Sequence, residues 1–406
     1  MKPRVVILAT LDTKACEASF LTSRIREGGG RPLLVDVGVL GTPGCEADIS
    51  RGEVAAAGGV SLGELVATAD RGLAAPVMAR GAQALVSTLV GEGEVQAVIG
   101  LGGTQGTTLC TSVMQALPYG LPKIMVSTVA SGDTSPFVGI KDITMMFSVG
   151  DLLGLNPFTR QVLAHAAGAA LGMAGARLSE GTSWSGRPVV GMTNLGVLTQ
   201  GALEAVRLLE AAGREVIVFH AVGSGGRAME QMLKEGLIHE VFDYALGEIS
   251  DELWGGLRSA GPERLTVAAG MGLPQVVVPG GAEHLGLLVD PPNTVPEDWK
   301  DHVHVFHSPV VFVPRLRGDE LVRVADTIAE RLGDAGAGTA LYLPEGGTSR
   351  YSVEGGPLHD PRADRMFFEA LEARLASRIE VRRLPHGVEE PEFIAEAVAA
   401  LLAFSS

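Results

Sequence analysis

The stretch Val98-Ile-Gly-Leu-Gly-Gly-Thr-Gln-Gly-Thr-Thr108 joins an apolar run to closely spaced glycines and then to hydroxyl side chains. The apolar part predicts a buried strand, and the hydroxyl-rich part predicts the first turn of a helix. The glycines between them permit left-handed backbone or the close approach of two segments. Because a helix N-terminus offers unpaired N–H groups and a positive dipole end, the turn predicts an anion site, typically for phosphate. The alternative is a purely structural glycine turn.

This turn does not match two common phosphate motifs. It lacks the Gly-Lys-Ser/Thr ending of a P-loop, and its glycines are spaced differently from those of the dinucleotide fingerprint. The name of neither motif can therefore be transferred to it.

On both sides of this turn, short apolar runs alternate with stretches of helical period. This rhythm predicts an α/β protein with two doubly wound, mostly parallel-sheet, Rossmann-like domains. In the first half we expect strands at residues 5–9, 31–37, 95–99, 123–127 and 143–147, with a polar loop over much of 37–70. In the second half we expect strands at 189–192, 215–219, 275–278, 310–313 and 339–343, and helices at 201–212, 228–235 and 389–404.

The length of 406 residues favours two domains, because a single core rarely grows that large. A stretch rich in Ser, Gly and Pro, residues 178–188, is followed by a new apolar run. We therefore expect an N-terminal α/β domain at 1–180 and a C-terminal α/β domain with a second glycine-rich anion loop at 188–406.

The charge balance limits the expected partners. Lys and Arg number 32 against 47 Asp and Glu, which gives a formal net charge of −15. Such a chain repels nucleic acid and anionic membranes, so neither is expected as a partner. The three cysteines form no CxxC pair, and no signal peptide or membrane-length apolar run is apparent, so we expect a cytoplasmic protein.

Two further loops follow predicted strands of the first half. The first is Ala9-Thr-Leu-Asp-Thr-Lys14, in which Asp12 could ligate a phosphate-bound Mg²⁺ and Thr13 could donate to phosphate. Asp12 or Thr13 could instead be a helix N-cap. The other, Ser127-Thr-Val-Ala-Ser-Gly-Asp-Thr134, again supplies hydroxyls and a carboxylate. In a parallel sheet these loops open at one edge, where they could converge on a triphosphate.

The second half contains a similar strand, glycine turn and helix in Phe219-His-Ala-Val-Gly-Ser-Gly-Gly-Arg-Ala-Met-Glu230. Gly225 and Gly226 would clear space for an anion, and Arg227 in the first turn would oppose the helix dipole unless a phosphate or carboxylate lay beside it. His220 and Glu248 are candidates for proton transfer. The alternatives are a solvated arginine and a hydrogen-bonded structural histidine.

A cluster of histidines, His302-Val-His-Val-Phe-His307, suggests a transition metal. Strand alternation would put His302 and His304 on one face and His307 on the other, but no acidic partner stands at a firm spacing. Weaker candidates in other glycine-containing turns are Glu283, His284 and Glu345.

The segments 9–14, 100–107, 122–132 and 219–230, in this order and spacing, resemble the Tm-1-like ATP-binding family, also called the UPF0261 family. The resemblance extends over nearly the whole chain. It implies a two-domain α/β protein that binds ATP and forms a homodimer, with the ATP-binding domain at 1–180. It also implies ATP contacts at Asp12, Thr13, Gly102, Gly103, Thr104, Gly106, Thr107, Ser127, Thr128, Ser131 and Gly132.

Together these inferences predict an ATP-binding protein whose N-terminal loops hold the triphosphate with Mg²⁺, while the second domain contributes Arg227 at an interdomain cleft. If it is an enzyme, we expect ligase- or phosphotransfer-like activation of a small molecule, with His220 or Glu248 moving a proton. One alternative is a non-catalytic, nucleotide-responsive regulatory module. Another is a metal-dependent small-molecule enzyme that uses His302 and His304.

Overall fold

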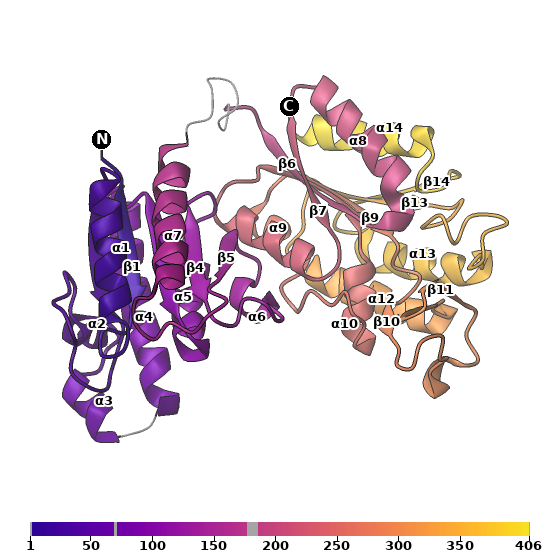
Figure 1. Ribbon diagram of the computed structural model, residues 1–406. Helices are drawn as coiled ribbons and strands as arrows, with labels where there is room; N and C mark the ends of the chain where they lie inside the picture. The colour runs from indigo at the N-terminus through magenta and orange to yellow at the C-terminus, as the bar shows by residue number, and fades with distance from the viewer. Residues whose placement is uncertain (1, 69–70, 177–185, 406) are drawn as a thin grey trace. The chain divides into compact units, whose positions relative to one another are not determined.

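The computed structural model of the protein describes residues 2–68, 71–176 and 186–405 (Figure 1). The chain divides into two compact units, Met1–Ser183 and Trp184–Ser406, called here the N-terminal and C-terminal domains and described separately. Residues 178–185 of the expected junction lie outside the described residues. Each domain has its own hydrophobic clusters.

The N-terminal domain is built on a five-stranded parallel sheet with the order β2-β1-β3-β4-β5. Its strands are β1 (Arg4–Ala9), β2 (Arg31–Asp36), β3 (Ala97–Gly102), β4 (Lys123–Ser127) and β5 (Ile143–Phe147). The strands expected in this half are confirmed, although the strand expected at 95–99 lies slightly further along. The order reverses between β1 and β3, as in a doubly wound fold.

Alternation along the strands assigns the helices to two faces of this sheet. Val5 and Ile7 belong to one cluster with residues of α1 and α7, whereas Val6 and Leu8 belong to another with residues of α2, α4 and α5. The helices are α1 (Ala15–Glu27), α2 (Arg51–Ala57), α3 (Leu62–Thr68), α4 (Arg71–Gly91), α5 (Thr104–Gln115), α6 (Ser135–Val138) and α7 (Pro157–Gly175).

The loop expected between residues 37 and 70 is confirmed for 37–50, and the helices α2 and α3, which the sequence analysis did not predict, follow it. A capping box starts α2: the Ser50 hydroxyl accepts from the Glu53 N–H at 3.3 Å, and Glu53 accepts from the Ser50 N–H at 2.8 Å. The Ser-x-x-Glu pattern that marks this start was visible in the sequence.

The C-terminal domain contains a six-stranded parallel sheet with the order β14-β13-β9-β8-β6-β7. Its strands are β6 (Val189–Asn194), β7 (Glu215–His220), β8 (Glu240–Ala245), β9 (Gln275–Gly280), β13 (Thr339–Pro344) and β14 (Glu380–Leu384). The order again reverses once, between β6 and β8. The predicted fold class of two doubly wound, mostly parallel domains is therefore confirmed.

Helices cover both faces of this sheet (Figure 1). Residues of α8 and α14 form one cluster with Val190 and Met192, whereas α10, α12 and α13 pack on the other face around Val277 and Leu341. The helical segments are η1 (Gly196–Leu198), α8 (Thr199–Ala211), α9 (Ser224–Lys234), α10 (Gly247–Trp254), α11 (Val267–Met271), η2 (Glu297–Trp299), α12 (Gly318–Arg331), α13 (Pro361–Leu375) and α14 (Pro391–Phe404).

Between β9 and α12 the chain forms a separate antiparallel sheet with the order β10-β12-β11. Its strands are β10 (Leu287–Leu288), β11 (His304–Ser308) and β12 (Val311–Pro314). The strand expected at 310–313 is therefore part of this antiparallel insertion and not of the parallel sheet.

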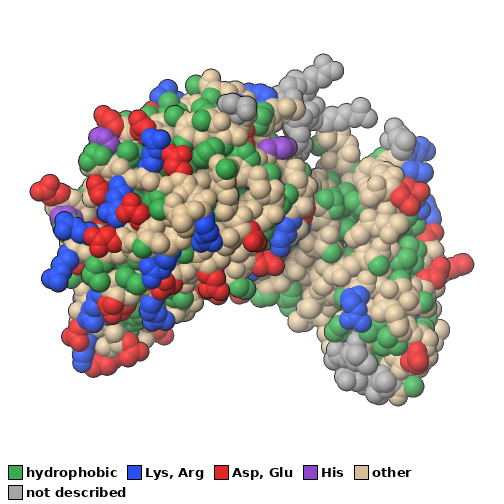
Figure 2. All heavy atoms as spheres, turned by 180° about the vertical axis from the view of Figure 1, so that it is seen from behind, with side chains coloured by type: hydrophobic (Ala, Val, Ile, Leu, Met, Phe, Trp, Pro, Cys, Tyr) green, Lys and Arg blue, Asp and Glu red, His purple; other side chains and the backbone are tan. Residues whose placement is uncertain are grey.

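On the face seen in Figure 2, acidic and basic side chains are interspersed and do not gather by sign. None of the helices in the described ranges combines the length and the apolar composition needed to cross a membrane.

Candidate functional site

The reversal of strand order in the N-terminal domain places the loop after β1 beside the loop after β3, with the loop after β4 next to it. In open parallel sheets, ligands bind at this reversal, outside the carboxyl ends of the strands. The three loops singled out from the sequence therefore lie at the edge where a ligand is expected.

The glycines of the central loop provide close approach, not left-handed backbone. Gly100, Gly102, Gly103 and Gly106 are not among the positive-φ residues. A Cβ on Gly102 would lie 2.8 Å from the Cα of Gly106, and a Cβ on Gly100 would lie 2.6 Å from the Cβ of Cys110. The first contact tightens the turn, and the second lets α5 lie against β3.

The amino end of α5 is open. Its N-cap residue is Gly103, in extended conformation, and no side chain of the described residues caps it. Thr104 and Gln105 are exposed, and the first turn carries no acidic residue. A Cβ on Gly103 would meet only the hydroxyl of Thr128, at 3.7 Å. Unpaired N–H groups with this much free space are well suited to an anion.

Two of the predicted hydroxyl groups connect the loops to one another. Thr107 and Ser127 are fully buried, and their hydroxyls lie 2.7 Å apart. Ser127 also accepts from the N–H of Val129 at 3.1 Å. They therefore fix the loop after β4 against α5, whereas Thr128 is half-buried and Ser131 and Gly132 are exposed.

The loop after β1 is organised by a residue that the sequence reading missed. Asp36, at the end of β2, is buried and accepts from the N–H groups of Leu11 at 3.1 Å and Gly38 at 2.9 Å. The signal was an acidic residue ending an apolar strand just before a glycine. Asp12 is half-buried, and the Thr13 hydroxyl is exposed, 3.0 Å from that of Thr10.

The only lysine of this loop, Lys14, is buried and donates to the carbonyl of Leu152. Asp12 forms no ion pair within the part of the chain that the structure describes. Its carboxylate lies near Gly38 and Gly41, whose added Cβ atoms would be 3.4 and 3.3 Å from its oxygens. A carboxylate that forms no ion pair, in the loop next to the open helix N-terminus in the order of the strands, is chemically suited to a phosphate-bound Mg²⁺.

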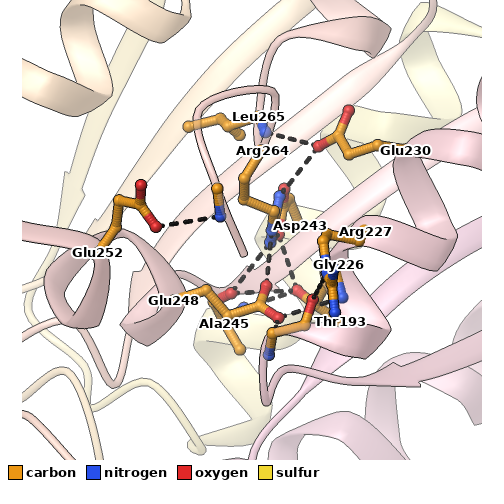
Figure 3. A network of polar contacts seen from close by, with 12 residues as sticks. Thr193, Gly226, Arg227, Glu230, Asp243, Ala245, Glu248, Glu252, Arg264 and Leu265 are labelled. Carbon is orange, nitrogen blue, oxygen red and sulfur yellow. Dashed lines mark hydrogen bonds and ion pairs between the residues drawn. The ribbon is translucent and has the colours of Figure 1, made fainter. Parts of the chain in front are cut away.

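The second glycine loop already contains an anion from the chain itself (Figure 3). The fully buried carboxylate of Glu248, on α10, accepts from the N–H groups of Gly223 at 2.7 Å and Gly226 at 3.1 Å. A Cβ on Gly226 would overlap this carboxylate, and one on Gly225 would overlap the carbonyl of His220. The space cleared by Gly225 and Gly226 is therefore filled internally and does not remain for an external phosphate.

Glu248 is in turn held by Arg264, which the sequence reading also missed. Arg264 is almost fully buried and donates to Glu248 at 2.7 Å and to both carboxylate oxygens of Asp243 at 2.5 and 2.6 Å. Burial lowers the pKa of Arg264, but the charges of Asp243, Glu248 and Glu230 raise it by more, so the guanidinium stays charged. Glu248 is thus part of a structural ion-pair network.

The other predicted catalytic residues of this domain lie at its surface. Arg227 is exposed, and its Nε donates to the carbonyl of Gly223 at 3.3 Å. His220 is also exposed, and its Nδ1 lies 3.3 Å from the carbonyl of Asn194. With Glu248 buried in the network, the three do not form a common proton-transfer site.

The histidine cluster is divided among different contacts. His302 is buried, with Nε2 3.1 Å from Glu320, and it precedes β11. The ring of His304 lies edge-on to Phe306 and tilted against Phe312, and the bulge after Phe306 breaks the expected alternation. Among the described residues, the only group with metal-like spacing comprises the half-buried His386 and the exposed Glu390 and Glu392.

Two of the weaker candidates pair with each other in the interior. Glu283 and His284 are buried, 3.0 Å apart, and Glu283 also accepts from the Ser349 hydroxyl. Burial raises the pKa of Glu283, but His284, Arg315 and Ser349 lower it by more, to about 2. Glu345 is exposed and lies 3.7 Å from Arg383.

Comparison with known proteins identifies the chain's relatives. Residues 3–179 match the N-terminal domain, and residues 187–405 the C-terminal domain, of an uncharacterised protein family, UPF0261. A UPF0261 protein of Clostridium tetani is 38% identical over 97% of this chain and 96% of its own length. UPF0261 protein RA0729 of Rhizobium meliloti is 37% identical over 98% of both chains.

A more distant relative is a plant protein. The ToMV resistance protein Tm-1(GCR237) of Solanum lycopersicum is 33% identical over 82% of this chain and 45% of its own length. Among solved structures, a UDP-N-acetylglucosamine 2-epimerase aligns over 93% of this chain and 98% of its own, with 10% identity and a TM-score of 0.22. That score is too low to support an argument.

Proposed function

This chain belongs to the UPF0261 family, and from the site described above we propose that its N-terminal domain binds ATP together with Mg²⁺. The open amino end of α5 is the observation that carries the proposal. Gly103, Thr104 and Gly106 would hold the phosphates through the N–H groups of the first turn, and the Thr128 hydroxyl beside them would donate a further hydrogen bond. The family resemblance at the same loops supports ATP as the ligand.

The charges around the site favour a metal-bound phosphate. Lys14 is engaged with a backbone carbonyl, and Asp12 contributes a further negative charge. A bare triphosphate beside Asp12 would be repelled, whereas Mg²⁺ neutralises phosphate oxygens and is ligated by carboxylates. We therefore assign Asp12 as the protein ligand of the ion.

The contrast with the C-terminal domain favours binding at the first loop alone. There Glu248 already takes the N–H groups that an external phosphate would need. We accordingly propose no nucleotide contact for Gly225, Gly226 or Arg227. We propose neither a role in turnover for His220 nor a transition-metal site at His302 and His304.

The test is calorimetric titration of the purified protein with ATP, with Mg²⁺ and with chelator, followed by product analysis of the same sample. We expect one ATP site per chain with Mg²⁺, and binding weakened at least about tenfold by chelation, equivalent to about 1.4 kcal/mol. Asp12→Asn should bind ATP weakly and lose most of this Mg²⁺ dependence. Absence of ATP binding by the wild-type protein would refute the proposal, and formation of ADP or AMP would add a catalytic function to it.

A further inference from the structure

The segment Ser148 to Leu155, which follows the edge strand β5, runs along the carboxyl edge of the N-terminal sheet. At one end the N–H of Ser148 donates to the carbonyl of Ser127 at 3.0 Å. At the other, the N–H of Gly154 donates to the buried Glu17 at 2.7 Å, and the carbonyl of Leu152 accepts from Lys14. These contacts tie the segment, called here the strap, to the loop after β4 and to the start of α1.

The strap holds one residue in a conformation that its side chain disfavours. Val149 has a φ of +60°, a region that β-branched residues rarely adopt. The turn is closed by a bond from the N–H of Gly150 to the carbonyl of Ser148 at 2.6 Å and by one from the Ser148 hydroxyl to the carbonyl of Gly150 at 2.7 Å. A glycine would fit this position without strain.

Packing does not account for a valine at this position. The Val149 side chain is 65% exposed, so it gains little from burial. Leu153, four residues further along the strap, is 77% exposed. Large apolar side chains presented by an anchored segment at a ligand-binding edge are typical of a binding surface.

We infer that the strap binds the base of the nucleotide, with Val149 and Leu153 packing against the faces of a purine ring while α5 holds the phosphates. The inference rests on the proposed function and adds the part of the ligand that phosphate contacts leave free. A nucleotide has a strongly anionic part, the phosphates, and a flat, largely apolar part, the base. The open helix N-terminus and the apolar strap, linked through Ser127, offer surfaces of both kinds.

The experiment compares two ligands that differ in the base. Calorimetric titrations with Mg²⁺–ATP and with Mg²⁺–tripolyphosphate are made on the wild-type protein and on Val149→Ser and Leu153→Ser. Val66→Ser is the matched control, because Val66 is 46% exposed on α3, which lies between β2 and β3 in the chain and is not part of the strap. Each strap variant should weaken ATP about tenfold and leave tripolyphosphate within about twofold, as loss of a contact to a base predicts.

The variant Val149→Gly distinguishes a loss of ATP binding from a loss of folding. It removes the side chain and relieves the positive φ, so the variant should melt at least as high as the wild-type protein while binding ATP about tenfold more weakly. Weak ATP binding in a protein of undiminished stability cannot be attributed to misfolding.

Other outcomes overturn the inference. Equal losses for both ligands would mean that the strap acts on the whole site, and unchanged ATP affinity would mean that the base binds elsewhere. A change in sedimentation with unchanged affinity would make the strap a contact between copies of the chain. Wild-type protein that binds tripolyphosphate as tightly as ATP would remove the base site but keep the phosphate site. Wild-type protein that binds neither ligand would refute the proposed function itself.

Discussion

At the scale of single residues, Gly226 shows why a glycine that resembles part of an anion site need not belong to one. A Cβ on Gly226 would overlap the carboxylate of Glu248 and would lie 2.6 Å from the Nε of Arg264. The glycine is required by an internal ion pair that joins residues distant in sequence. Its neighbours in the chain cannot reveal this.

Gly226→Ala should therefore destabilise the C-terminal domain by at least about 2 kcal/mol, because the methyl group displaces a buried, hydrogen-bonded carboxylate. Gly270→Ala is the control, since a Cβ there meets nothing within 4 Å and the site lies in α11 of the same domain. It should be neutral or slightly stabilising. Urea unfolding measures both, and similar midpoints for the two variants would contradict the assignment.

A second prediction concerns Asp364, whose carboxylate accepts from Arg315 at 2.6 Å. Burial raises the pKa of Asp364 to about 6 despite the lowering effect of Arg315, with Glu283 and Asp360 also raising it. The folded protein thus binds this proton more tightly than the unfolded chain does. As pH rises from about 4 to about 6, this group should lower the free energy of unfolding, by about 3 kcal/mol at most.

Asp364→Asn removes this titration but keeps an acceptor for Arg315. The free energy of unfolding of the variant, relative to wild type, should rise as pH increases from 4 to 6. The carboxylate of Glu283, whose pKa is lowered to about 2, has the opposite effect. Its contribution to the free energy of unfolding is lost as the pH decreases below about 4.5. Urea unfolding at several pH values tests this, with the exposed Asp298→Asn as control. Parallel curves for Asp364→Asn and wild type would contradict the prediction.

At the scale of elements, comparable helices differ in which groups accept hydrogen bonds from the N–H groups at their amino ends. The N–H of Gln200 in α8 donates to Glu389 at 2.9 Å, and the start of α9 is occupied by Glu248. In α5, by contrast, no side chain of the described residues takes this position. The same strand–turn–helix pattern therefore serves internal packing in one domain and leaves the helix N-terminus without a side-chain cap in the other.

Gly103→Asp should give α5 a carboxylate at its amino end, as α8 and α9 have. A side chain at Gly103 has room, and an aspartate there would cap the helix and stabilise the domain by about 1 kcal/mol. The same carboxylate would repel phosphate, so ATP binding should be lost. Gly103→Ala, which adds only a methyl group, should retain binding. Thermal unfolding and calorimetry measure the two effects, and full ATP affinity in Gly103→Asp would exclude α5 as the phosphate site.

At the scale of the whole molecule, every hydrophobic cluster is confined to one of the two domains. The loops proposed to hold ATP all belong to the N-terminal domain. Because a domain with its own core can fold alone, a fragment that ends within residues 177–185 should unfold cooperatively.

That fragment should also bind Mg²⁺–ATP within about tenfold of the full chain. Calorimetric unfolding and titration of the fragment are the measurements. A folded fragment without ATP affinity would show that the N-terminal loops are not sufficient for the site.

Local sequence patterns were enough to predict the fold class, the strands of the N-terminal sheet and the family. Apolar runs at strand spacing and glycine turns are local patterns, and parallel sheets bury such runs on both faces. These patterns also located the loops after β1, β3 and β4, because position after a strand fixes the edge at which a loop lies. A strand near 310–313 was predicted, but its place in a separate antiparallel sheet with the short strands β10 and β11 was not.

Which of the two glycine loops is open depends on tertiary contacts. Gly103 and Gly226 lie in similar local sequences, yet Glu248 and Arg264 come from segments more than twenty residues beyond Gly226 to fill its loop. The same holds for Asp36, which reaches the loop after β1 through strand pairing. Whether a helix N-terminus is free for a ligand depends on which distant charge the fold brings to it, and that is a property of packing that no local pattern records.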